Sequence, residues 1–219
     1  MASSRYIEDK EIRAMRVRTW VEAVMYASGI TLVELEQKFS ENRLSDPVAR
    51  SCIWDKYRNG YVVPRIGKRP NGDYHLANRV EACYPGTMLW LTSPIWRLAD
   101  KAPMEMTEIR KIYEGMPYLF RSMFVEVEHK VKGVFWRRYV EIDKCCETLR
   151  NLETLPAFIS LLTIIKEAEI IQDQDVHDYV FDVVIEYKDK LIEHPILNFV
   201  TEWMFEYLSD RWKNAGYFD

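Results

Sequence analysis

Glycine, proline and cysteine are scarce in this sequence, and each scarcity narrows the possible folds. Eight glycines and nine prolines in 219 residues are few for a protein of many strands and tight turns, so helix is the favoured element. The four cysteines contain no Cys-x-x-Cys pair, which argues against a disulfide framework or a zinc knuckle and predicts reduced, cytosolic thiols. The longest apolar run, near residues 155–165, is too short to span a bilayer.

Motifs typical of enzymes are missing as well. The sequence has no glycine-rich phosphate loop, no nucleophile elbow and no dinucleotide-binding fingerprint, and its four histidines form no His-Glu-x-x-His pair. Asp173, Asp175, His177 and Asp178 are close enough in sequence to resemble a metal-binding pattern. Acidic residues at the start of a helix are explained by the helix dipole without a metal. We therefore expect a non-enzymatic protein with no cofactor and no metal.

Composition predicts a folded, all-α chain. Hydrophobic residues make up 48% of the sequence and aromatic residues 13%, well outside the range of disordered chains. The amino terminus, MASSRYIEDKEIRAMRVR, is too charged for a signal peptide. These observations together predict a cytoplasmic protein that does not enter a membrane.

Charge divides the chain into two parts. Residues 1–97 carry 15 Lys and Arg against 11 Asp and Glu, a net charge of +4, whereas residues 98–219 carry 15 against 23, a net charge of −8. Lys101-Ala102-Pro103 interrupts the helical pattern where the sign changes. We predict a domain of residues 1–100 that contacts nucleic acid and an acidic helical bundle of residues 101–219.

Residues 29–65 have the order of parts that a helix-turn-helix needs. Thr31 followed three residues later by Glu34 is a capping-box pattern, and Leu32, Leu35 and Phe39 then recur at helical spacing. A second helix is predicted from Pro47, with Ser45 or Asp46 as its N-cap, to Gly60, which can adopt the left-handed conformation that closes a helix.

The second predicted helix has one apolar and one polar face. Its inward residues are Ala49, Ile53, Trp54 and Tyr57. Its outward residues are Arg50, Ser51, Asp55, Lys56 and Asn59. Such a helix can lie in a major groove, where arginine and lysine suit guanine edges or phosphates and asparagine suits adenine.

Two stretches within residues 29–65 resemble the helix-turn-helix of the phage lambda repressor/Cro-like DNA-binding proteins. GITLVELEQKF, residues 29–39, is similar to its first part, in which Gly-apolar-Thr precedes a helix of the form xxELxxxL. IWDKYRNGYVVP, residues 53–64, resembles the end of the recognition helix, where a glycine is followed at the fourth position by a proline. The chain departs from the family between Phe39 and Ile53, which is several residues longer than the usual turn.

The resemblance implies two groups of DNA-contacting residues. Those that face the bases or the phosphates are Arg50, Ser51 and Lys56. Those that hold the DNA backbone are Arg58, Arg65, Lys68 and Arg69. The alternative is a purely structural pair of amphipathic helices joined by a polar loop, whose outer cations are only solvated.

The remaining segments are predicted from the same signals. Residues 61–75 contain the turn sequence Pro-Asn-Gly-Asp and form either a small wing or a surface loop. Trp90 and Trp96 are predicted to pack in a core or an interdomain seam, with Pro94 breaking any helix between them. The other helices are expected at residues 9–28, 75–84, 107–129 (interrupted at Gly115-Met116-Pro117), 134–151, 155–171, 175–192 and 195–212.

Two functions from different classes follow. The first is a sequence-specific regulator of transcription that binds double-stranded DNA, as a homodimer because one helix-turn-helix reads too few base pairs alone. The second is a protein-interaction module, such as an antitoxin, immunity or adaptor protein, whose acidic helices engage a basic partner.

Overall fold

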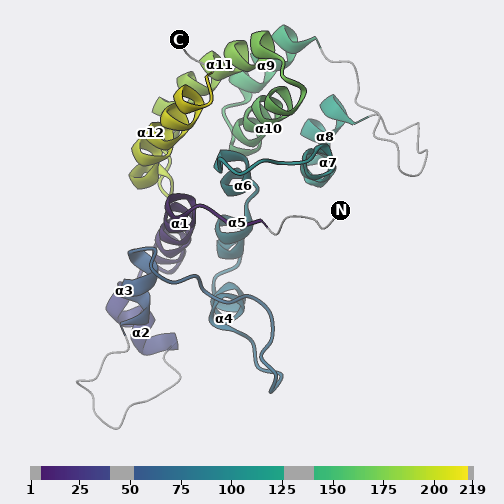
Figure 1. Cartoon of the computed structure of the whole chain (residues 1–219). Helices are drawn as coiled ribbons and strands as arrows, with labels where there is room; N and C mark the ends of the chain where they lie inside the picture. Colours follow the sequence, from purple (N-terminus) through teal and green to yellow (C-terminus); the bar gives the residue numbers. More distant parts are fainter. Residues whose placement is uncertain (1–5, 40–51, 126–140, 217–219) are drawn as a thin grey trace.

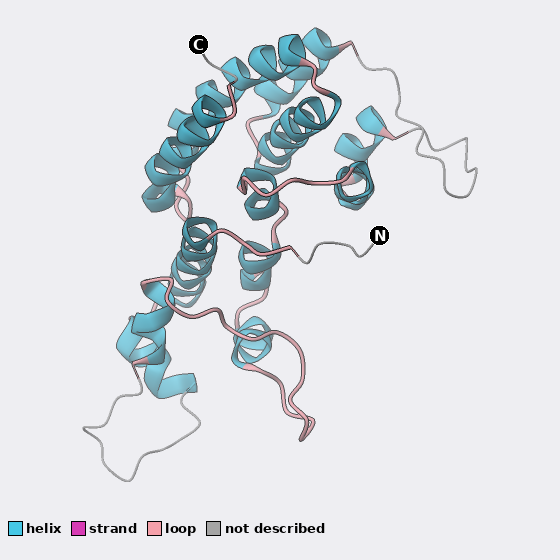
Figure 2. Cartoon of the chain, in the orientation of Figure 1, coloured by secondary structure: helices cyan, strands magenta, loops and turns pink. Residues whose placement is uncertain are grey.

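A computed structural model of the chain describes residues 6–39, 52–125 and 141–216, and the regular elements among them are all helices (Figures 1 and 2). The all-α prediction is therefore confirmed for these residues. In chain order the helices are α1 Lys10–Ser28, α2 Leu32–Phe39, α3 Ile53–Arg58, α4 Leu76–Cys83, α5 Thr87–Thr92, α6 Ile95–Ala99, α7 Met106–Gly115, α8 Tyr118–Phe124, α9 Ile142–Leu152, α10 Leu155–Ile171, α11 Gln174–Ile192 and α12 Asn198–Asn214.

Helix α1 begins and ends where the sequence signals predict. The Asp9 carboxylate accepts a hydrogen bond from the Glu11 N–H at 2.8 Å, which satisfies one of the unpaired N–H groups of the first turn. Gly29 closes the helix in the left-handed conformation, with φ of 67°, and its N–H donates to the Met25 carbonyl at 2.8 Å. The predicted helix 9–28 is confirmed.

Helix α1 contributes to two hydrophobic cores. Val17, Trp20, Val21 and Val24 pack in a smaller core with residues of α2, α3, α4 and α5. Ile12 and Met15, one to three turns earlier, pack in a larger core formed with α6 to α12. Figure 1 shows α1 midway along the elongated molecule, between α2–α4 at one end and α9–α12 at the other.

The two cores do not follow the predicted domain division at residue 100. The amino-terminal part of α1 and all of α6 pack in the larger core, although both precede residue 101. The core boundaries fall within α1 and between Leu91 of α5 and Ile95 of α6. The division into residues 1–100 and 101–219 stays a prediction.

Helix α10 is the centre of the larger core. Every residue from Ala157 to Ala168 is buried, because α11, α7, α6 and α9 pack around this helix. Its two buried hydroxyl groups are satisfied within the helix: Ser160 donates to the Pro156 carbonyl at 2.9 Å and Thr163 to the Ile159 carbonyl at 2.7 Å. The prediction that Leu155–Ile171 is a central apolar helix is confirmed.

Prolines interrupt the helices at the predicted places. The chain leaves helix at Met116, before Pro117, which separates α7 from α8. Ser93 is extended before Pro94, and this break separates α5 from α6. Trp96 is buried in the larger core and donates a hydrogen bond from its indole N–H to the Trp90 carbonyl at 2.7 Å, as the packing interpretation of this segment expects.

The helix predicted at residues 134–151 is wrong in its extent. Residues 134–151 were expected to form a single helix, but α9 begins at Ile142 because Glu141 is extended, with φ of −68° and ψ of 108°. Residues 126–140, which include the expected core residues Phe135 and Tyr139, lie outside the described residues. Helix α12 begins three residues after Pro195, the predicted start.

A buried group of charged side chains joins α10, α12 and the end of α6. The Lys166 ammonium lies 3.1 Å from a Glu169 carboxylate oxygen, and the same carboxylate accepts hydrogen bonds from Arg211 and, at 2.9 Å, from the Trp212 indole. Arg211 also donates to the Leu98 and Ala99 carbonyls, both at 3.0 Å. Every member has a partner, as buried charges require. Burial, and then the nearby Arg211 charge, lower the pKa of Lys166 to about 8.

Within the described ranges, no helix is both long enough and apolar enough to cross a bilayer.

Replacing Lys166 by methionine is expected to change how stability depends on pH. Because the folded-state pKa of about 8 lies below the unfolded value of about 10.4, the folded protein releases this proton first as the pH rises. The free energy of unfolding of the wild type should therefore rise relative to Lys166→Met between pH 8 and 10, by about 1–3 kcal/mol. Urea unfolding at several pH values measures the difference.

The matched control is Lys144→Met, which removes a solvent-exposed lysine of α9. The stability of this variant should run parallel to that of the wild type over the same pH range. A Lys166→Met curve that is also parallel to the wild type would contradict the lowered pKa of the buried Lys166.

Candidate functional site

The capping residues from which α2 was predicted do form hydrogen bonds at its start. The Thr31 N–H donates to the Glu34 carboxylate at 2.7 Å and the Glu34 N–H donates to the Thr31 hydroxyl at 3.4 Å, so the capping box is formed. The hydrogen bonds that the Glu34 carboxylate accepts from the Thr31 N–H and, at 2.8 Å, from the Thr31 hydroxyl lower the pKa of Glu34. Leu32, Leu35 and Phe39 are all buried in the smaller core, which confirms the predicted apolar stripe.

Helix α3 is shorter than predicted. It begins at Ile53, because Cys52 is in the left-handed conformation with φ of 51°, and a residue with that backbone cannot continue a right-handed helix. An uninterrupted helix from Pro47 to Gly60 is therefore wrong. The expected N-cap Ser45 or Asp46 and the expected contact residues Arg50 and Ser51 lie outside the described residues. The predicted end is confirmed: α3 closes at Arg58, and Gly60 has φ of 71°.

Aromatic packing holds α3 against α1 and α2. The Trp54 ring stacks on that of Trp20, with centroids 5.4 Å apart and planes at 9°, and Tyr57 meets both rings edge-on. The buried Glu36 carboxylate of α2 accepts a hydrogen bond from the Trp54 N–H at 3.3 Å. The predicted inward positions of Trp54 and Tyr57 are thus confirmed.

Polar residues gather at the opposite, solvent-facing side of the end of α3. Lys56, Arg58 and Asn59 are exposed there. Among the described residues Arg58 forms one ion pair, with Glu22 of α1 at 3.9 Å, and its side chain remains 55% exposed. Such a long, exposed pair contributes little to stability, so Arg58 can exchange this partner for another anion.

The segment between α3 and α4 is a loop that main-chain hydrogen bonds hold in place. The Arg69 N–H donates to the Asp73 carbonyl at 2.7 Å and the Gly72 N–H donates to the Arg69 carbonyl at 2.9 Å, which confirms the predicted turn at residues 70–73. Lys68 and Tyr74 form an isolated antiparallel bridge, and the Lys68 ammonium lies 5.1 Å from the Tyr74 ring centroid. Of the two predicted forms, the surface loop describes this segment better than a wing.

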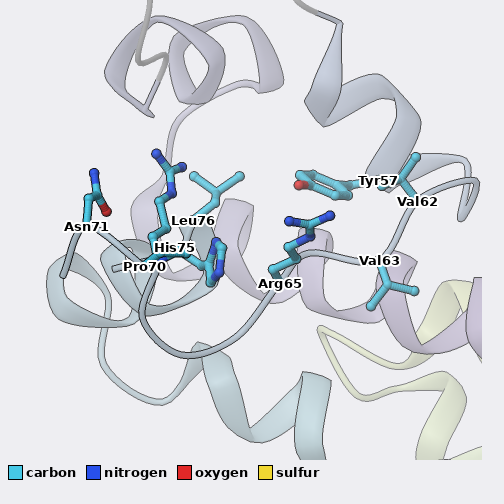
Figure 3. A pocket seen from close by; sticks show the side chains of 9 residues that line it. Tyr57, Val62, Val63, Arg65, Pro70, Asn71, His75 and Leu76 are labelled. Carbon is cyan, nitrogen blue, oxygen red and sulfur yellow. The ribbon is translucent and has the colours of Figure 1, made fainter. Parts of the chain in front are cut away.

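An open pocket of about 520 Å³ lies between this loop and the end of α3. Arg65, Arg69, Asn71 and His75 supply polar atoms to its wall, and the apolar part comes from Tyr57, Val62, Val63, Pro70 and Leu76. Figure 3 shows Arg65 beside the Tyr57 ring, with the His75 imidazole directed toward the same space. Burial, followed by the charge of Glu36, raises the pKa of Tyr57, and the Arg65 charge opposes this rise.

The sequence-predicted contact residues are thus distributed over one end of the molecule. Lys56, Arg58 and Asn59 lie at the end of α3, and Lys68 lies on the loop. Arg65 and Arg69 lie in the pocket. Sequence reasoning missed His75 and Asn71 as companions of these arginines, because no local pattern connects them. The turn at residues 70–73, which brings the chain back on itself, was the available signal.

The acidic residues near the start of α11 have a structural role. Asp173 caps the helix by accepting a hydrogen bond from the Val176 N–H at 3.1 Å, and Asp178 accepts one from Gln174 at 2.8 Å. No group of three or more His, Cys, Asp or Glu in metal-binding geometry occurs among the described residues. All four cysteines are described, and none forms a disulfide.

Compared with models of known protein families, with curated proteins and with solved structures, the chain matches none of them.

Gly60 fixes the distance between the end of α3 and α1. A Cβ atom at this position would lie 2.5 Å from Cβ and 2.6 Å from Cα of Ala14, and φ is positive. Gly60→Ala is therefore expected to lower the free energy of unfolding by about 2–5 kcal/mol, through backbone strain and overlap with α1. Chemical denaturation measures the loss.

The matched control is Gly29→Ala. Gly29 also has a positive φ, of 67°, but a Cβ there meets nothing within 4 Å, so only the conformational penalty of about 1–2 kcal/mol is expected. If both variants lose the same stability, then the close approach of Gly60 to α1 does not contribute.

Proposed function

We propose that the protein is a sequence-specific DNA-binding regulator of transcription, and that it contacts double-stranded DNA as a homodimer through the end of α3 and the loop that follows. The observation that carries the proposal is the group of exposed or half-exposed cations on this face: Lys56, Arg58, Arg65, Lys68 and Arg69. DNA phosphates are the abundant ligands for such a group.

The shape of this face supports binding to a groove. Trp54 and Tyr57 hold α3 to α1 through stacked and edge-on contacts with Trp20, and Trp54 also contacts Phe39 of α2. The exposed side of α3 therefore has a rigid support. Lys56 and Asn59 on that side have the donors that read guanine and adenine edges. Because α3 has only six described residues, α3 accounts for a few contacts, and the loop cations supply the contacts with the backbone.

The charge balance supports local rather than general binding. The whole chain has a net charge of −4, so its overall charge does not attract phosphate. A protein of this charge binds DNA only where cations are concentrated. A single face of this size reads few base pairs, and two copies related by symmetry double the number.

The surroundings of these cations also favour a role in ligand binding over a role in stabilising the fold. In the larger core, Lys166 and Arg211 are buried with partners on neighbouring elements. The Lys56 side chain makes no hydrogen bond or ion pair with any of the described residues. Its charge therefore contributes nothing to holding α3 in place, and it is available to an anionic ligand.

Lys56→Ala is expected to weaken DNA binding and to reduce its salt dependence. The bound sequence is first selected from a random DNA pool, and affinity is then measured by fluorescence anisotropy at several salt concentrations. Loss of one phosphate contact should reduce the slope of log affinity against log salt by about 0.9. Circular dichroism should show an unchanged fold, because Lys56 is exposed.

The control is Lys144→Ala, which removes an equally exposed lysine from α9, in the acidic half. This variant should bind DNA as the wild type does. If no sequence is enriched from the pool, or if both variants show the same slope as the wild type, the proposal is overturned, and a protein partner for the acidic helices becomes the better reading.

A further inference from the structure

The pocket beside α3 combines two kinds of surface. Arg65, Arg69 and His75 bring cationic and hydrogen-bonding groups to its wall, and Tyr57, Val63 and Leu76 bring apolar surface. Among the described residues that line it, none is an aspartate or a glutamate. Its volume of about 520 Å³ lies in the range of small-molecule sites, which are apolar clefts with a few converging polar groups.

We propose that this pocket binds a mononucleotide, a phosphate ester that carries a flat heterocyclic ring. The guanidinium groups of Arg65 and Arg69 are forks that match the oxygen atoms of a phosphate, and His75 adds a ring nitrogen to the same wall. This inference goes beyond DNA binding and does not depend on it, because the ligand is a free small molecule.

The apolar part of the pocket wall is the reason for proposing a ligand that contains a flat ring. An inorganic phosphate would pair with Arg65 but leave the exposed surfaces of Val62, Val63 and Leu76 in water. A neutral ring compound would cover these surfaces and leave Arg65 without an anion. Among the described residues Arg65 has no hydrogen bond or ion pair, and Figure 3 shows its guanidinium beside the Tyr57 ring. A base in this region would contact the planar guanidinium of Arg65, and such cations bind the faces of bases.

The wall is held in place by hydrogen bonds. The Gly67 N–H donates to the Asn78 side chain of α4 at 2.6 Å, and the His75 N–H donates to the Gly67 carbonyl at 3.0 Å. These bonds tie the loop that carries Arg65 to the helix that follows His75. The ligand therefore does not have to order a mobile loop, which would reduce its affinity.

Isothermal titration calorimetry of the full chain with AMP, without DNA, tests the proposal. AMP is expected to bind with one site per chain, and adenosine and inorganic phosphate are each expected to bind at least about tenfold more weakly. Arg65→Ala should weaken AMP binding at least about tenfold, through loss of the guanidinium–phosphate pair. Methyl NMR signals of Val62, Val63 and Leu76 should shift on AMP addition and identify the site.

Lys56→Ala is the matched control, since Lys56 is an exposed cation of α3 that does not line the pocket. It should bind AMP with wild-type affinity, even though it is expected to weaken DNA binding, so failure of either proposal is recognised separately. The mononucleotide proposal is overturned if AMP binds no more tightly than phosphate. It is also overturned if Arg65→Ala, with an unchanged melting temperature, retains AMP binding.

Discussion

Packing of α1 against two cores at once is the constraint on which the rest of the structure depends. Ile12 and Met15 lie in the larger core, and Trp20 and Val24 lie in the smaller one. A helix buried on several sides cannot shift along its axis without opening one of these cores, because protein interiors are close-packed. The stacked rings of Trp20 and Trp54 then fix the position of α3 relative to α1. The exposed cations of α3 are placed with it.

Charged side chains are buried and paired in the larger core, but exposed to solvent around the smaller core. In the larger core, Lys166, Glu169 and Arg211 are withdrawn from water and satisfied by one another and by main-chain carbonyls, since an unpaired buried charge is costly. Around the smaller core, Lys56, Arg58 and Arg65 remain in water. This contrast is why ligand binding is proposed for the second group, while the first is explained by stability alone.

The loop between α3 and α4 has a large share of the proposed contacts although it contains no helix or strand. Its turn at residues 70–73 is closed by main-chain hydrogen bonds, and Gly67 is bonded to Asn78 of α4. Binding residues are often placed on loops that a rigid scaffold holds. Here the scaffold is the pair of helices that flank the loop, one of which packs on α1 through Tyr57 and Trp54.

The helical class and many helix ends follow from local sequence signals, because caps, glycines and prolines act over a few residues. Asp9 and Gly29 bound α1, the Thr31–Glu34 pair starts α2, and Pro94 and Pro117 separate their neighbours. The capping signals upstream of α3 did not indicate the left-handed conformation of Cys52. One residue in that conformation does not alter the spacing of apolar residues in the sequence.

Which helices share a core, and which cations lie near one another, depends on how distant segments pack together. The approach of Gly60 to Ala14 and the meeting of Arg65 with His75 in one pocket join residues from different segments. Helical periodicity reports which face of a helix is buried, and not which partner covers it. The DNA-contacting role that residues 29–65 suggest is a property of the local pattern, whereas the pocket beside it exists because α1 brings α3 and the following loop to the same place.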